Sequence, residues 1–252
     1  MPFTVKKKVF DACFMASIVY GCEGWINVNC RPIERLYMDA IKALLNVRQT
    51  TSNDLCLIEL GLPRIAAFIK QRQREFFNKM CSQRHDLSDD PLMSVMETLR
   101  RSQTATWRYI DEIMKQNRNY VTDSLEETKQ YVRQNASTRS KLATYLDMNT
   151  ELVSPGLYKI DVPEYMRVAV SRLRLISHNL KIETGRWSRI ERDRRLCQCG
   201  IVQTERHIVQ ECQLLRNVRD KFSQVDINNY QLLMNCDNLD TARLLFELIV
   251  NI

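Results

Sequence analysis

The stretch PIERLYMDAIKALL, residues 32–45, carries the clearest fold signal in this chain. Its apolar side chains recur at intervals of three and four residues, at Ile33, Leu36, Tyr37, Ala40, Ile41, Leu44 and Leu45. This spacing forms one face of an α-helix, and Pro32 suits the first turn, where a missing N–H costs nothing. The stretch therefore predicts a helix that packs a wide apolar face.

The segments that follow continue the helical pattern. Residues 54–60 should form a shorter helix that stops at Gly61, and Pro63 should open the next segment. Residues 64–84 repeat the helical spacing, with a basic face that either is solvated or contacts nucleic acid. Turns are scarce, because the 252 residues include only six glycines and six prolines. We therefore predict an all-α fold, an extended helical bundle.

The N-terminus resembles a signal peptide, because three lysines precede an apolar run at residues 9–20. Asp11 interrupts the run and no small-residue cleavage site follows, so an amphipathic helix is the preferred interpretation. No other segment approaches membrane-spanning length, and we expect no membrane partner. The nine cysteines are odd in number and mostly scattered, which favours reduced thiols in the cytoplasm or nucleus rather than secretion.

Two breaks divide the chain into three predicted regions. Residues 85–91 are polar and acidic, like a linker, and residues 150–163 contain the turn-forming Ser154-Pro155-Gly156. The regions are 1–84, helical; 85–163, a helical linker region; and 164–252, with an arginine-rich helix, a metal segment and C-terminal helices. Within the last region, residues 227–252 should form one or two helices.

Four potential metal ligands occur within sixteen residues: Cys197, Cys199, His207 and Cys212. Thiolates and one imidazole suit tetrahedral zinc, and four protein ligands leave no position for a catalytic water. We therefore predict one structural zinc ion in a small knuckle-like segment. The Cys-x-Cys start needs a tight turn, for which Gly200 can supply an unusual backbone conformation. The alternative is two surface cysteines and a solvated histidine near a buried Cys212.

Positive charge is concentrated beside these ligands. The chain has a net charge of +7, and the segment from Arg167 to Arg195 contains nine basic against three acidic residues. On a helix over residues 164–177, Arg167, Ser171, Arg174 and His178 would share one polar, basic stripe.

An aromatic residue and further arginines follow that stripe. Guanidinium groups bind phosphates and an aromatic ring can stack on a base, so the predicted nucleic-acid contacts are Arg167, Arg174, His178, Arg186, Trp187, Arg189, Arg194 and Arg195. Trp187 could instead belong to the core, and His178 could be an ordinary polar-face histidine.

Two separated parts of the chain carry a family resemblance. The run SRLRLISHNLKIETGRW (171–187), followed by RRLCQCG, QTERH and Cys212, resembles the C-terminal Cys-Cys-His-Cys segment of non-LTR (LINE-type) retrotransposon reverse transcriptases. At the other end, KKKVFDACFMASIVYGCEGW (6–25), LLNV (44–47) and SNDLCLIELGLPRI (52–65) resemble the thumb and post-thumb region of the same proteins. The similarity covers about residues 5–80 and 164–216, in the family's order.

The resemblance implies a thumb-like bundle that follows a polymerase palm, with possible association with such a module. Reverse transcriptases hold two metal ions with converging aspartates. The nearest approach to their aspartate pair is Tyr37-Met38-Asp39-Ala40, which has alanine in place of the second acid and lies inside the predicted helix. No palm or endonuclease segment is evident, so we expect no enzyme activity and no small-molecule substrate.

Two functions remain open. The first is a non-catalytic nucleic-acid-binding module that grips template RNA, an RNA–DNA hybrid or target DNA. The second is a helical structural or interaction protein, or an inert retroelement remnant, in which zinc only stabilises the fold. The arginine density favours the first, although a net charge of +7 over 252 residues is modest for a nucleic-acid-binding protein.

Overall fold

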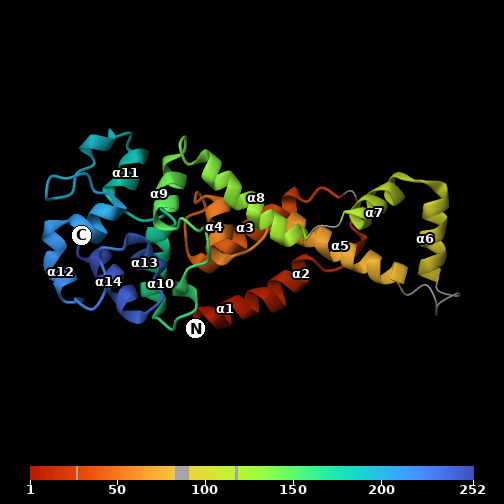
Figure 1. The fold of residues 1–252 in the computed structure, drawn as a ribbon, viewed down its shortest axis with the longest axis horizontal. Coiled ribbons are helices and arrows are strands. Elements are labelled where there is room, and N and C mark those ends of the chain that lie inside the picture. The colour runs from red at the N-terminus through yellow and green to blue at the C-terminus, as the bar shows by residue number, and fades with distance from the viewer. Residues whose placement is uncertain (27, 83–90, 117–118) are drawn as a thin grey trace. The chain divides into compact units, whose positions relative to one another are not determined.

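The computed structural model describes residues 1–26, 28–82, 91–116 and 119–252 (Figure 1). In this part of the chain the elements are α-helices and short helical turns, and the one extended pairing is an isolated bridge between Leu196 and Val202. The all-α prediction is therefore confirmed. No helix of the described residues is long and apolar enough to cross a membrane. Residues 85–90 of the predicted linker lie outside the described ranges.

The chain forms two compact units, each assembled from separate stretches. Unit 1 comprises residues 1–10, 39–62 and 128–252, and unit 2 comprises residues 11–38 and 63–127. This division differs from the three consecutive regions expected from the sequence. The difference arises because part of the predicted linker region enters the core of unit 1, where Leu142, Tyr145 and Met148 are buried.

Unit 2 has a small apolar core, formed by Phe77, Met80, Met96 and Ile110, and a buried glutamine, Gln73. Its helices are α2 (Ala16–Ile18), the first part of α3 (Arg31–Leu45), α5 (Ile65–Ser82), α6 (Pro91–Ser102), α7 (Ala105–Lys115) and the first part of α8 (Tyr120–Asn135). The amide of Gln73 donates to the carbonyls of Cys22 (2.9 Å) and Trp25 (3.0 Å), and its oxygen accepts from the Tyr109 hydroxyl (2.8 Å). These bonds tie α5 to α7 and to the turn at residues 22–25.

Unit 1 holds the larger core and the predicted metal ligands. Its helices are α1 (Phe3–Val9), the last part of α3, α4 (Asn53–Leu60), the end of α8, α9 (Ser140–Met148), α10 (Glu164–Arg174), α11 (Lys181–Trp187), α12 (Arg216–Asp220), α13 (Tyr230–Asn235) and α14 (Leu239–Val250). In α14, Leu244, Leu245 and Leu248 are fully buried. The prediction of one or two C-terminal helices is confirmed by α13 and α14.

Helix α4 is largely buried in unit 1 and ends where the sequence indicated. Gly61 adopts a left-handed conformation with φ of 63°. Its N–H donates to the Ile58 carbonyl (3.0 Å), and the Leu62 N–H donates to the Leu57 carbonyl (2.9 Å). This pair of bonds is a Schellman motif, which satisfies the last carbonyls of the helix.

The one acidic side chain buried in α4 organises a polar cluster inside unit 1. Glu59 is fully buried and receives two hydrogen bonds from Arg174 of α10, with Nε at 2.6 Å and Nη2 at 3.0 Å. The hydroxyls of Tyr145 (2.7 Å) and Tyr158 (3.2 Å) donate to the same carboxylate. Burial of a charge requires this degree of pairing, because an uncompensated charge in the core is very costly. The cluster therefore fixes α4, α9 and α10 to one another.

Candidate metal centre

The first two cysteines are placed by a tight hairpin. The bridge between Leu196 and Val202 is extended by a bond from the Cys197 N–H to the Ile201 carbonyl (2.7 Å). Inside the turn, Gly200 has φ of +87° and donates its N–H to the Cys197 carbonyl (3.0 Å). A side chain is disfavoured at such a φ, so glycine permits the turn that brings two thiols two residues apart to one side.

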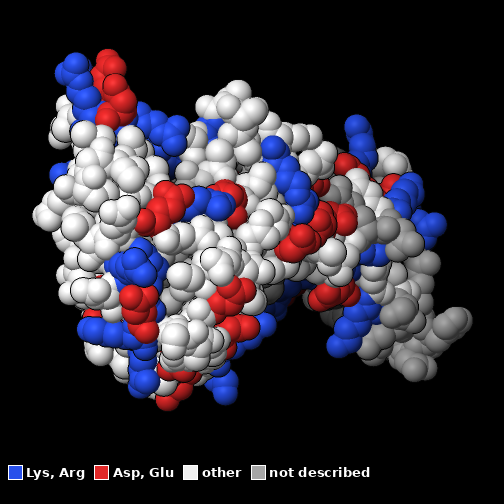
Figure 2. All heavy atoms as spheres, turned by 60° about the vertical axis from the view of Figure 1, so that its left-hand side comes forward, with Lys and Arg blue, Asp and Glu red and all other residues white. Residues whose placement is uncertain are grey.

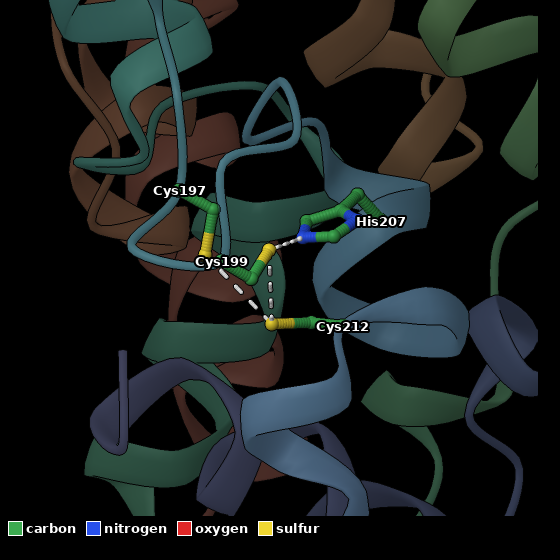
Figure 3. A group of neighbouring side chains, drawn as sticks. All are labelled: Cys197, Cys199, His207 and Cys212. Carbon is green, nitrogen blue, oxygen red and sulfur yellow. Dashed lines mark hydrogen bonds between the residues drawn. The ribbon is translucent and has the colours of Figure 1, made fainter.

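The other two ligands come from the helical turn that follows. The Thr204 hydroxyl accepts from the His207 N–H (3.0 Å), which is how a capping side chain starts a helix. A π-helical turn then spans His207–Glu211, and the Cys212 N–H donates to the His207 carbonyl (2.7 Å). The wider π turn rotates Cys212 back towards the imidazole. Both residues thus face the hairpin (Figure 3).

All four ligand atoms converge on one point. The thiol sulfurs, Sγ, of Cys197 and Cys212 are 3.7 Å apart, those of Cys199 and Cys212 are 4.0 Å apart, and the Cys199 Sγ lies 3.2 Å from the His207 Nε2. The whole set lies within 4.8 Å. In a regular zinc tetrahedron two sulfurs would be separated by about 3.8 Å and a sulfur–nitrogen pair by about 3.5 Å. The spacing therefore fits one metal ion with four protein ligands.

Burial and charge at the cluster also suit a cation. Cys197, His207 and Cys212 are buried. Burial works against the Cys197 thiolate, but hydrogen bonds from the Cys199 backbone and from neighbouring ligands lower the pKa of Cys197 to about 7. Burial and the adjacent Cys197 raise the pKa of Cys212 to about 11. A divalent cation removes the repulsion between neighbouring thiolates, and thiolates are its ligands.

The second ring nitrogen of His207, Nδ1, is available to fix the orientation of the imidazole. Its Nδ1 is buried, has no hydrogen-bond partner within the described ranges, and lies 3.6 Å from the Glu211 carboxylate one turn along. Metal-bound histidines commonly donate this N–H to a carboxylate. Four protein ligands fill a tetrahedron, so the chemistry that this site offers is cross-linking of the hairpin to the helical turn rather than activation of water.

The predicted basic stripe on α10 is not a surface, and this part of the predicted contact set is wrong. Arg174 is fully buried on Glu59, and Arg167 is buried beneath α1, with its guanidinium 4.7 Å from the Phe3 ring centroid. The helical spacing holds for Arg167, Ser171 and Arg174, whose face packs against buried acidic and aromatic groups. The helix ends at Arg174 rather than at residue 177, because Ile176 adopts a left-handed φ of 52°, so His178 does not continue this face. Of the two acids in the helix NDLCLIEL, Glu59 lies within the apolar stretch, and it was the sequence signal for a buried partner.

His178 is also buried and was wrongly placed on that surface. Its Nε2 lies 2.9 Å from the Glu205 carboxylate, and its Nδ1 accepts from the Leu180 N–H (3.2 Å). Because Nδ1 accepts, the ring proton belongs to Nε2 and points to Glu205. His178 therefore anchors the segment before α11 to the helical turn that carries His207.

The remaining predicted contacts lie in what we call the basic loop, residues 186–195. Trp187, Arg189 and Arg194 are exposed, whereas Arg186 and Arg195 are half-buried. Trp187 is 56% exposed, which excludes the core placement. Arg195 has a structural task, because its guanidinium donates to the carbonyls of Ile182 (2.8 Å) and Ile190 (2.6 and 2.9 Å).

Two residues of this region were missed by sequence reasoning. Arg48 lies with its guanidinium 4.2 Å from the centre of the Trp187 ring, although the two residues are far apart in sequence. Arg192 is exposed in the 3₁₀ turn Arg192–Arg194. It contributes to the positive charge of the segment from Arg167 to Arg195 but was not among the predicted nucleic-acid contacts. No local pattern links Arg48 to Trp187, whereas Arg192 could have been included from its position in the arginine cluster.

Comparison with models of known protein families gives no match for this chain, and neither curated proteins nor solved structures show a significant similarity.

Proposed function

We propose that the chain is a non-catalytic nucleic-acid-binding module, of the kind found at the C-terminus of non-LTR retrotransposon reverse transcriptases. The observation that carries this proposal is an exposed tryptophan in an arginine-rich loop next to the metal cluster. Trp187 offers a ring for base stacking, and Arg189 and Arg194 are exposed cations within seven residues of it. Sequence-tolerant binding of single strands uses this combination of aromatic and basic groups.

The metal in this proposal is zinc, with a structural role. Three thiolates and one imidazole favour zinc over the oxygen-preferring Mg²⁺ and Ca²⁺. Cys197 follows Arg195 closely, so a cross-linked hairpin would fix the end of the basic loop. Zinc would thus hold the loop in one conformation and reduce the conformational entropy that binding costs.

The charge distribution favours a moderate, salt-sensitive affinity. Figure 2 shows basic and acidic side chains interspersed over the visible face rather than a single basic patch. In the basic loop, Glu191 and Asp193 alternate with five arginines. Phosphate contacts would therefore be few, and stacking on Trp187 would supply a substantial share of the affinity.

The absence of catalysis is part of the proposal. Among the described residues, the one group of three or more His, Cys, Asp or Glu side chains placed to hold a metal is the cluster at Cys197. Asp39 lies within α3, next to the buried Tyr37 and Met38. The module would act beside a separate polymerase module, in the nucleus or cytoplasm.

Binding can be tested by fluorescence anisotropy with labelled single-stranded RNA and DNA at several salt concentrations. Arg189 has a left-handed φ of 53°, so Arg189→Gly removes a cation while relieving the backbone. Combined with Arg194→Ala, it should flatten the log–log salt slope by about 1.4, because each single-strand phosphate contact contributes about 0.7. Trp187→Ala should weaken binding by about 1–3 kcal/mol and preserve the slope.

Arg243→Ala is the matched control, because it removes an exposed cation from α14, outside the basic loop. It should leave affinity within about twofold. Binding at micromolar or weaker affinity that ignores all these substitutions would support the alternative, a helical structural protein or retroelement remnant with a purely structural zinc.

A further inference from the structure

A pocket of 520 Å³ lies in unit 1, between helix α9, helix α11 and the segment that leads to His207. Four arginines line it: Arg186, Arg192, Arg195 and Arg206. Its volume is within the range of pockets that hold small organic ligands. The pocket is separate from the metal cluster, since none of the four metal ligands contributes to its lining.

The pocket has an excess of positive charge. Its only acidic lining residues are Asp147 and Glu205, against four arginines. Both carboxylates already have partners. Asp147 accepts from Arg206 (2.6 and 2.8 Å), and Glu205 is held by His178 (2.9 Å). The lining therefore carries about two uncompensated positive charges.

The other three arginines are incompletely neutralised. Arg195 donates to backbone carbonyls, which satisfy its N–H groups but not its charge. Arg186 has its Nε 3.5 Å from a Glu183 carboxylate that also binds Lys141, so two cations share one anion. Arg192 makes no ion pair within the described ranges and is exposed.

Arginines held at a pocket with their charges uncompensated are suited to an anionic ligand. A phosphate monoester carries a charge of about −1.5 to −2 near pH 7, whereas a diester within a strand carries one negative charge. The monoester matches the excess charge of the lining. Planar guanidinium groups also bind two phosphate oxygens at once.

We propose that this pocket binds the phosphate monoester of a nucleotide, with Arg192 and Arg186 as its principal contacts and Arg195 as part of the cationic wall. The ligand is either a free mononucleotide or the 5′-phosphorylated end of a strand. The choice of a nucleotide as carrier rests on the proposed function, and the phosphate selectivity rests on the pocket itself.

The first test uses Ala143, an exposed α9 residue that lines the pocket. Ala143→Glu introduces a carboxylate without removing any arginine, and Ala143→Gln has almost the same shape without the charge. Fluorescently labelled adenosine 5′-monophosphate should bind the native chain, and labelled adenosine should not. Ala143→Glu should weaken the nucleotide affinity at least tenfold relative to Ala143→Gln.

The second test compares an arginine of the pocket with one outside it. Arg192→Ala should reduce mononucleotide affinity about tenfold, whereas Arg243→Ala, which removes an equal charge from α14, outside the pocket lining, should reduce it less than threefold. Equal binding of nucleotide and nucleoside, or equal effects of Ala143→Glu and Ala143→Gln, would overturn the inference.

Oligonucleotides with and without a 5′-phosphate identify the source of the phosphate. A preference for the phosphorylated strand that Ala143→Glu abolishes would assign the pocket to strand ends. Phosphate-dependent mononucleotide binding without that preference would assign it to free nucleotides. Strand binding that depends on Trp187 and Arg189 but shows no pocket effect would leave the proposed function standing and reject the pocket. Mononucleotide binding without any strand binding would support the pocket and reject the proposed function.

Discussion

Arg174 shows how one residue's role can be decided by a partner distant in sequence. Its guanidinium binds Glu59, 115 residues away, and Tyr145 and Tyr158 complete the coordination of that carboxylate. Replacing a buried ion pair by apolar residues is often neutral. Here, replacing the Arg174–Glu59 pair by apolar residues would leave the hydroxyls of Tyr145 and Tyr158 without their acceptor. We therefore infer that all four polar groups stabilise unit 1 together.

At this scale we predict that Arg174→Ala destabilises the protein by about 3–5 kcal/mol, because it leaves the Glu59 charge buried and unpaired. Thermal or urea unfolding measures this change. Arg172→Ala is the control, since Arg172 is exposed on the same helix and loses only hydrogen bonds to Asn46, worth about 1 kcal/mol. If Arg174→Ala kept the stability of the protein but lost nucleic-acid affinity, Arg174 would instead be a contact to nucleic acid, as predicted from the sequence.

The metal hairpin is an element whose conformation depends on a few backbone features and on the ligands. It contains one isolated bridge and few buried apolar side chains, with Leu196 and Ile201 exposed. Such a segment cannot bury enough apolar surface to offset its conformational entropy. We therefore expect metal binding to supply much of the free energy that orders the hairpin, residues 196–202.

The purified protein should contain one zinc ion per chain by elemental analysis. Cys212→Ser, or Cys199→Ser, should lower that content to near zero and increase amide hydrogen exchange in the hairpin. Cys13→Ser is the control, because Cys13 is an exposed cysteine of unit 2 and is not one of the four ligands. A protein with no stoichiometric zinc, or with unchanged content in the ligand variants, would contradict the assignment.

Gly200→Ala tests the hairpin turn without touching a ligand. No atom lies within 4 Å of the added methyl group, so its effect comes from the φ of +87° alone. Such backbone strain costs about 1–2 kcal/mol, which should weaken zinc binding by about tenfold. Competition with a chromogenic chelator measures this shift, and an unchanged zinc affinity would show that the turn does not limit metal binding.

At the scale of the whole molecule, the proposed module acts by holding nucleic acid rather than by transforming it. The two-metal mechanism of polymerases requires carboxylates that converge on one spot. In the part of the chain that the structure describes, the one group of three or more potential ligands placed to hold a metal is the cysteine–histidine cluster, and Asp39 belongs to a regular helix.

We predict that the chain shows no primer extension on an RNA template, with or without added magnesium. The measurement is nucleotide incorporation against a heat-killed control. Incorporation that Asp39→Ala abolishes would show that the segment Tyr37-Met38-Asp39-Ala40 does hold a catalytic metal.

The sequence by itself determined the helical class, several helix ends and the identity of the clustered ligands. Each of these features depends on residues that are close together in the sequence. They are an apolar repeat of 3.6 residues, a glycine at φ of 63° after α4, and four ligands within sixteen residues. Leu36 marks the limit, since it lies on the predicted apolar face but is 54% exposed. A repeat shows which residues share a face, not what covers each of them.

Only the tertiary structure decided which polar faces meet solvent. Arg167, Arg174 and His178 share a helical spacing, yet all three lie inside unit 1, whereas Trp187 is exposed and contacts Arg48. A sequence pattern places charges on a face but does not supply their partners. Those partners, Glu59 and Glu205 among them, come from distant segments brought together when the apolar core forms, and the same assembly creates the arginine-lined pocket.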